Sequence, residues 1–243
     1  MKVNFHPSFW LTVFTIPVFF ALLSLGTWQV YRLNWKTELI MEFNRSFNDK
    51  PLTINQVDEN YSDFRYRRII VDGNFDHEKE IQLIGKTYEG TAGFHIVTPL
   101  IVDDERTILI NRGWIPKKYL NKSSRKFTLL DGKVKIIGII KLPQQKGMFV
   151  PDNEPKNGFW FTINPEEIFS YLNINGLDHF YIDQLRGDEK DILPIAIDGK
   201  IELPNNHLQY AFTWYSLALA LLFIFFSWHK SKGLLKFQSN ENQ

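Results

Sequence analysis

The sequence PNNHLQYAFTWY at residues 204–215 runs directly into an uncharged stretch that ends at Trp228. Residues 208–228 carry no charged side chain, and a helix rising about 1.5 Å per residue crosses a hydrocarbon layer of about 30 Å within this length. We therefore expect a transmembrane helix over residues 205–228, with the polar Asn-Asn-His sequence at its mouth. Neutral imidazole at that depth can ligate iron or copper. Alternatively, His207 is an interfacial residue that lies in the hydrated headgroup layer and binds no metal.

A second apolar run, residues 9–31, is also uncharged and long enough to span a membrane. A cleaved signal peptide would have a shorter apolar run and small residues at its cleavage site, so we expect an uncleaved signal anchor. Pro17 can kink this helix, which lipid-embedded helices tolerate. Beyond the run, five residues fall near helical spacing: Leu33, Lys36, Ile40, Phe43 and Phe47. This spacing predicts that the helix continues out of the membrane until Pro51.

Positive charges at the chain ends indicate the orientation of the two spans. The tails, residues 1–8 and 229–243, contain four lysines and one acid. The positive-inside rule therefore places both tails in the cytoplasm, or in the matrix of an organelle. Arg32 and Lys36 argue mildly the other way, but long segments translocate largely regardless of charge. Residues 32–204 are thus expected outside, and their near-neutral balance of charge argues against a nucleic-acid partner.

The chain has no cysteine and three methionines. A disulfide framework, a thiol relay and every cysteine-ligated copper, zinc or iron–sulfur site are therefore excluded. A methionine-rich copper site is excluded by the same composition. Any metal would have to be bound by histidine, methionine or carboxylate.

The segment between the spans is long enough for one domain with a core. A helix is expected after Asn164, with Pro165 at its first position and two acids in its first turn. Few crossover helices separate the β-branched runs, so the sequence predicts an exported α+β domain with a mainly antiparallel sheet. The expected strands are residues 68–75, 80–84, 94–98, 107–111, 133–140, 159–163 and 180–183.

No catalytic motif is present in this domain, so we expect a protein that is not an enzyme. Its histidines are scattered, without the spacing of a metal site. The one compact signature is NRGWIP at residues 111–116. It predicts either a tight turn in which Gly113 adopts positive φ and Trp114 packs on the sheet, or a protein-binding site anchored by Arg112 and Trp114.

Five stretches occur in an order that closely resembles the Surfeit locus protein one family, the assembly factors for haem–copper cytochrome c oxidase. They are GTWQVYRLNWK at 26–36, VDGNF at 71–75, residues 93–100, LINRGWIP at 109–116 and PNNHLQYAFTW at 204–214. The resemblance covers almost the whole chain. It implies two spans around an exported domain, a role in maturing the haem-bearing oxidase subunit, and haem a as cofactor, with His207 as the candidate iron ligand.

The chemistry of haem a fits such a location, because its isoprenoid tail belongs in lipid and its propionates in water. Helical spacing from His207 places Ala211, Trp214 and Ala218 on one face, as small residues and an aromatic wall. The first span reaches the same outer surface at Gly26, Trp28, Gln29 and Arg32. Gly26 permits close approach and Arg32 can pair with a propionate. Alternatively, Trp28 and Trp214 belong to the ordinary aromatic belt.

Two functions remain open. The favoured one is a haem-handling chaperone that presents haem a to the haem-bearing subunit of cytochrome c oxidase and also contacts the haem a synthesis machinery and membrane lipid. The rival is a scaffold that stabilises an assembly intermediate without a cofactor, with the Asn-Asn-His sequence only capping the helix. Copper delivery is disfavoured by the composition. No presequence rich in arginine and serine precedes the first span, so we expect the inner membrane of a bacterium, with the central domain periplasmic.

Overall fold

The structure is a computed structural model that describes residues 2–187, 192–199 and 205–238. The chain forms two compact units, residues 1–41 with 202–243 and residues 42–201. The expected boundary at residue 204 and residues 239–243 of the expected C-terminal tail lie outside the described residues. The predicted limits of the membrane and exported segments stay predictions.

Two long helices dominate the first unit. Helix α1 extends over Phe9–Asn48 and helix α3 over His207–Ser231. The continuation of the first helix beyond the apolar run, predicted from spacing, is confirmed. By length and composition both helices could cross a membrane, with mean hydropathy of 2.0 and 1.7 in their most apolar windows. Only 11% of each window is buried, so neither is the enclosed core helix of a globular domain.

The two chain ends pair with each other. Strand β1, Lys2–Phe5, runs antiparallel to strand β9, Leu235–Gln238. Beside this pair, the Ser8 N–H donates to His229 Nε2 at 3.0 Å, and His229 Nδ1–H donates to the Phe225 carbonyl at 2.8 Å. His229 is fully buried. Both ring nitrogens of His229 therefore have partners inside the protein.

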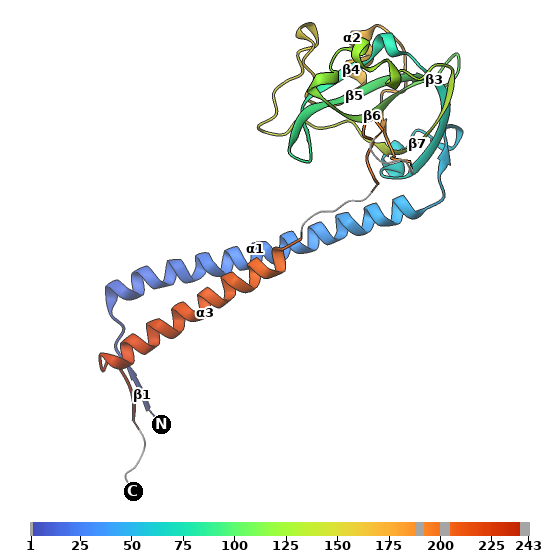
Figure 1. Ribbon diagram of the computed structural model, residues 1–243. Coiled ribbons are helices and arrows are strands. Elements are labelled where there is room, and N and C mark those ends of the chain that lie inside the picture. The colour runs from blue at the N-terminus through green and yellow to red at the C-terminus, as the bar shows by residue number, and fades with distance from the viewer. Residues whose placement is uncertain (1, 188–191, 200–204, 239–243) are drawn as a thin grey trace. The chain divides into compact units, whose positions relative to one another are not determined.

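The second unit is built on a seven-stranded sheet whose order is β2-β3-β7-β8-β6-β5-β4 (Figure 1). An additional pairing of β3 with β5 closes five strands into a ring. The bounds are Leu52–Thr53 for β2, Arg68–Phe75 for β3, Ile81–Tyr88 for β4, Thr91–Ile101 for β5, Thr107–Pro116 for β6, Lys133–Lys141 for β7 and Tyr181–Gln184 for β8. Short 3₁₀ helices cover Ile54–Gln56, Tyr61–Phe64, His77–Lys79, Lys117–Tyr119, Lys122–Thr128 and Pro155–Asn157.

The sheet is mainly antiparallel, as predicted, with parallel pairing of β2 with β3 and of β6 with β8. The expected strand at residues 159–163 is wrong: only isolated bridges form there, at Phe159 and Trp160. Trp160 is 2% exposed. The apolar run inserts an aromatic ring into the core instead of extending the sheet.

Alternation along the strands divides the core into two clusters. Along β6, Ile108 and Ile110 join one cluster, whereas Leu109 joins the other, because successive strand side chains point to opposite faces. The second cluster lies under helix α2, Pro165–Leu172, through Ile168 and Phe169. This helix begins at the predicted position, although the Asn164 side chain makes no capping hydrogen bond.

A chain of polar side chains crosses from β5 through β6 to β8. Asn111 Nδ2 donates to Asp183 Oδ1 at 2.7 Å and contacts His95 Nδ1 at 3.3 Å. Burial lowers the pKa of His95 from 6.5 to about 4. Since the amide nitrogen can only donate, His95 Nδ1 accepts this hydrogen bond and the ring is held neutral.

We expect this histidine to make the fold sensitive to acid. Between pH 6.5 and about 4 the unfolded chain protonates His95 while the folded chain does not, so stability falls as pH drops through this window, by about 1.4 kcal/mol per unit of pKa difference. Urea unfolding of the His95→Leu variant at pH 7 and pH 4.5 should show a smaller loss than the parent protein. Equal losses in both proteins would contradict the assignment.

Candidate functional site at the helix pair

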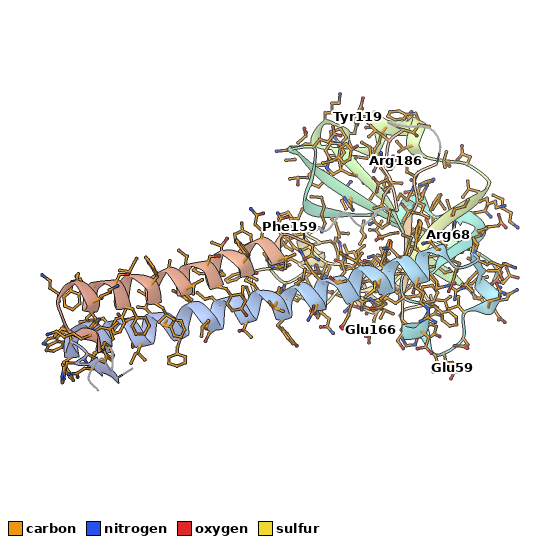
Figure 2. The ribbon with its side chains drawn as sticks, turned by 90° about the horizontal axis from the view of Figure 1, so that it is seen from below. Glu59, Arg68, Tyr119, Phe159, Glu166 and Arg186 are labelled. Atoms are coloured by element: carbon orange, nitrogen blue, oxygen red, sulfur yellow. The ribbon has the colours of Figure 1, made fainter. Side chains whose placement is uncertain are left out.

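Helices α1 and α3 lie side by side along the first unit (Figure 1, Figure 2). Gly26 of α1 faces the ring of Tyr215, and a Cβ built on this glycine would lie 2.8 Å from that ring. The hydroxyls of Thr27 and Tyr215 are 3.1 Å apart. The close approach expected at Gly26 therefore accommodates an aromatic side chain of the partner helix.

His207, the first residue of α3, contacts Gln29 of α1: the distance from Nδ1 to Oε1 is 2.7 Å. A carbonyl oxygen can only accept a hydrogen bond, so Nδ1 carries the hydrogen, and in the neutral ring the lone pair is then on Nε2. A fixed tautomer with a free nitrogen is the usual arrangement of a metal-binding imidazole, whose other nitrogen is held by an acceptor.

The neighbouring asparagines do not cap α3 through their side chains. Asn206 occupies the cap position without a side-chain capping hydrogen bond. Asn205 Nδ2 instead donates to Thr37 Oγ1 of α1 at 3.4 Å. The Asn-Asn-His sequence thus joins the two helices by two polar contacts, from Asn205 and from His207.

The face of α3 that begins at His207 is its covered face. Ala211 and Ala218 are each 2% exposed, and Trp214 is half-buried. Small side chains on this face allow two helices to approach closely. The indole Nε1 of Trp214 and the amide oxygen of Asn205 are buried and have no hydrogen-bond partner in the described part of the chain. Two polar atoms of this unit, one beside His207 in the sequence and one two helical turns further along α3, are therefore left to be satisfied.

Two further predicted site residues lie on the open surface of α1. Trp28 is 54% exposed, and Arg32 is exposed with its guanidinium 4.1 Å from the centre of the Trp35 ring. The structure thus joins His207 to Gln29 and places Ala211 and Trp214 on the covered face of α3. Trp28 and Arg32 are left on the exposed surface of α1. An exposed ring at this place is what an aromatic belt at the membrane surface requires of Trp28.

Arg112 and Trp114, the candidate protein-binding residues, are buried within the second unit. They are 3% and 6% exposed. The Arg112 guanidinium lies 4.6 Å from the centre of the Phe75 ring and donates to the Thr128 carbonyl. The Trp114 ring packs 5.4 Å from that of Tyr88. Neither side chain offers surface to a partner, and both serve the packing of the sheet.

The backbone at Gly113, between Arg112 and Trp114, does not form the expected tight turn. Gly113 has the predicted positive φ, +118°, but it lies inside β6 at a bulge, where the register against β5 shifts by one residue. Bulges commonly redirect a side chain. Here the strand continues, and Trp114 pairs with Ile195.

Within the described residues, no group of three or more histidines, cysteines or acids could hold a bare metal ion. Iron carried in a porphyrin is different, because the macrocycle supplies four ligands and the protein supplies only axial ones. A single histidine with a fixed tautomer is sufficient for that kind of site.

Comparison with known proteins gives a consistent result. The model of the SURF1 family matches residues 16–219. Surfeit locus protein 1 of Xenopus tropicalis is 32% identical, over 86% of this chain and 72% of its own length. The human protein of that name is also 32% identical, over 87% and 74%. A SURF1-like protein of Rickettsia bellii is 28% identical, over 85% and 86%.

We expect Gly113→Ala to destabilise the protein strongly. A Cβ at this position would lie 2.1 Å from the Ile195 carbonyl oxygen, and the backbone has φ of +118°, so we expect a loss of at least about 3 kcal/mol. Gly132→Ala is the matched control, since φ is +77° there and nothing lies within 4 Å; it should cost only about 1 kcal/mol. Urea unfolding followed by tryptophan fluorescence measures both, and equal losses would show that the contact with Ile195 is unimportant.

Proposed function

Because the chain belongs to the SURF1 family, we propose that it is a membrane-bound assembly factor for haem–copper cytochrome c oxidase. In this proposal it is not an enzyme: it holds haem a and presents it to the haem-bearing subunit, receiving it from the haem a synthesis machinery. The observation that carries the proposal is the hydrogen bond between His207 and Gln29.

That hydrogen bond suits a haem ligand for two reasons. It orients the imidazole and selects the neutral tautomer whose lone pair is on Nε2, and an acceptor on Nδ1–H makes the ring a stronger donor to metal. Gln29 would act as a positioning residue and His207 as the axial ligand. When bound, haem would supply an iron centre whose absorption spectrum depends on its ligand and its surroundings.

The polar atoms without partners in this unit also fit a bound haem. Trp214 Nε1–H is buried and unpaired in the described chain, and burial of such a donor is costly unless it is satisfied. A haem propionate or formyl oxygen would accept from it. Arg32 is exposed at the same end of the first apolar run and would provide a charge-assisted contact to a propionate.

The rival function, a scaffold without cofactor, assigned only a capping role to the Asn-Asn-His sequence. The absence of a capping hydrogen bond from the Asn206 side chain and the contact of His207 with the other helix argue against a purely capping role. A pure cap would need neither Gln29 nor a fixed tautomer. The covered face of Ala211 supports the same helix pairing.

We place the protein in the inner membrane of a bacterium. The two apolar helices support a membrane location, and the lysine-rich tails support their cytoplasmic placement, with residues 32–204 in the periplasm. The pairing of β1 with β9 supports tails on one side, since strands separated by a membrane could not exchange backbone hydrogen bonds.

We expect His207→Ala to lose haem while retaining the fold. Protein co-expressed with the haem a synthesis pathway and purified in detergent should show no Soret band, or a shifted one. His207→Met should retain some binding with an altered spectrum, because thioether can replace imidazole. Gln29→Leu should weaken haem affinity by about 10–100-fold without removing the ligand. His6→Ala, which alters an exposed histidine of the same unit, is the matched control and should leave the spectrum unchanged.

Circular dichroism of the same samples separates ligand loss from misfolding. An unchanged Soret band in folded His207→Ala would rule out His207 as the ligand. Failed membrane insertion of that variant would favour the scaffold function, because the residue would then serve only the helix pair.

We expect reporter fusions to place the chain ends and the central unit on opposite sides of the membrane. A reporter active only in the cytoplasm should work when fused after Gln243 and fail when inserted at residues 121–123, near the 3₁₀ helix Lys122–Thr128. A reporter active only in the periplasm should give the reverse result. Cytoplasmic activity at the internal site would overturn this topology.

A further inference from the structure

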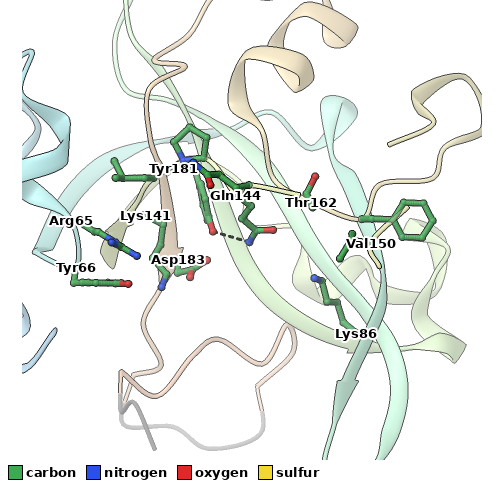
Figure 3. A pocket seen from close by; sticks show the side chains of 13 residues that line it. Arg65, Tyr66, Lys86, Lys141, Gln144, Val150, Thr162, Tyr181 and Asp183 are labelled. Carbon is green, nitrogen blue, oxygen red and sulfur yellow. Dashed lines mark hydrogen bonds between the residues drawn. The ribbon is translucent and has the colours of Figure 1, made fainter. Parts of the chain in front are cut away.

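The second unit contains a pocket of about 740 Å³ that none of the residues discussed for haem line. Its wall is formed by the end of β7, the connection after it and the β8 residues Tyr181 and Asp183 (Figure 3). This volume is within the range of small-molecule sites, about 300–1,000 Å³. The pocket lies wholly within residues 65–183.

Three cations line this pocket. Arg65 and Lys141 both lie close to the Tyr66 ring, 4.6 and 4.8 Å from its centre, and Lys86 lies across from them (Figure 3). In the described chain none of the three forms an ion pair within 4 Å. Burial lowers the pKa of both lysines, which means that their charges are poorly solvated. A bound anion would relieve that cost.

One carboxylate, Asp183, lies at the same pocket, where its charge interacts with those of Lys141 and Lys86. It accepts a hydrogen bond from Asn111 and is nearly enclosed. Burial raises the pKa of Asp183, with Lys141 and Asn111 opposing that effect. With Asp183 ionised, the pocket carries two excess positive charges. That excess matches a dianion, such as a phosphate monoester near neutral pH.

The remaining wall is suited to an apolar body. Phe161 and Val150 line the pocket beside Leu142 and Pro143. A second hollow of about 670 Å³ adjoins it and shares the connection after β7. That hollow has the opposite character: Glu167 and Asp152 line it, and its one lysine, Lys146, pairs with Asp152 at 2.5 Å. The charges therefore direct the anionic end of a ligand to the first pocket.

We propose that this pocket binds a small ligand through a phosphate monoester, with Arg65, Lys86 and Lys141 around the dianion and the apolar body against Phe161 and Val150. The Gln144 amide, which donates to the Tyr181 hydroxyl at 2.9 Å, holds the floor of the pocket in place. A lipid headgroup of the phosphatidic acid type and a soluble phosphate ester share this chemistry.

Isothermal titration calorimetry of the full chain in detergent tests the proposal with phenyl phosphate as the probe. One molecule should bind per chain, more tightly than inorganic phosphate, which lacks the apolar body, or benzoate, which carries one charge. Lys86→Met and Lys141→Met should each weaken binding by about tenfold or more. Lys135→Met is the matched control, because Lys135 lies exposed on the same strand as Lys141, and it should leave affinity within about twofold.

Circular dichroism confirms that each variant is folded before titration. Absence of saturable binding of phenyl phosphate at millimolar concentration would overturn the proposal, as would an equal loss in Lys135→Met and Lys141→Met. Titration with dihexanoyl phosphatidic acid then distinguishes the two sources. Tighter binding than phenyl phosphate assigns a lipid headgroup, and weaker binding assigns a soluble ester.

Discussion

Strand β5 forms backbone hydrogen bonds with β4 and β6 along its length and with β3 at its end. The last of these pairings is short, joining Asn74 and Phe75 to Ile101 and Leu100, yet it turns an open sheet into a ring. Closure requires the sheet to bend, and the bulge at Gly113 provides part of that bend. Closure of the ring also encloses one of the two core clusters. The burial of Arg112 and the polar chain that ends at Asp183 both follow from this closed geometry.

The helix pair follows a different principle. Its apolar side chains are mostly uncovered, so the hydrophobic effect does not hold the two helices together in lipid. Close packing at Gly26 and a few polar contacts do, and one of these contacts is the histidine that we assign to haem. A residue that both joins the helices and presents a metal ligand couples cofactor binding to helix packing. In the proposed function, haem uptake and release would then change the packing of both helices.

Local patterns in the sequence predicted much of this structure. Uncharged runs identified both long helices, and alternation of β-branched residues identified most strands. Contacts between distant segments could not be predicted in this way. Nothing local indicates that Asn74 pairs with Ile101 or that Trp160 enters the core. The sequence placed Gln29 and His207 at the same surface, but not in a hydrogen bond with each other. Arg112 was also ambiguous, because a buried arginine on a closed sheet has the same sequence signature as one exposed for a partner.

The pairing of the chain ends has a consequence for biosynthesis. Ser8 and His229 are separated by almost the entire chain, and β1 meets β9 only when the last residues have been made. Until then the first helix has no partner helix, while the central unit already has every strand of its ring. The order of translation therefore dictates that the helix pair, and with it the His207 site, matures last. If the site holds haem a, as we propose, the cofactor can enter only after synthesis of the chain is essentially complete.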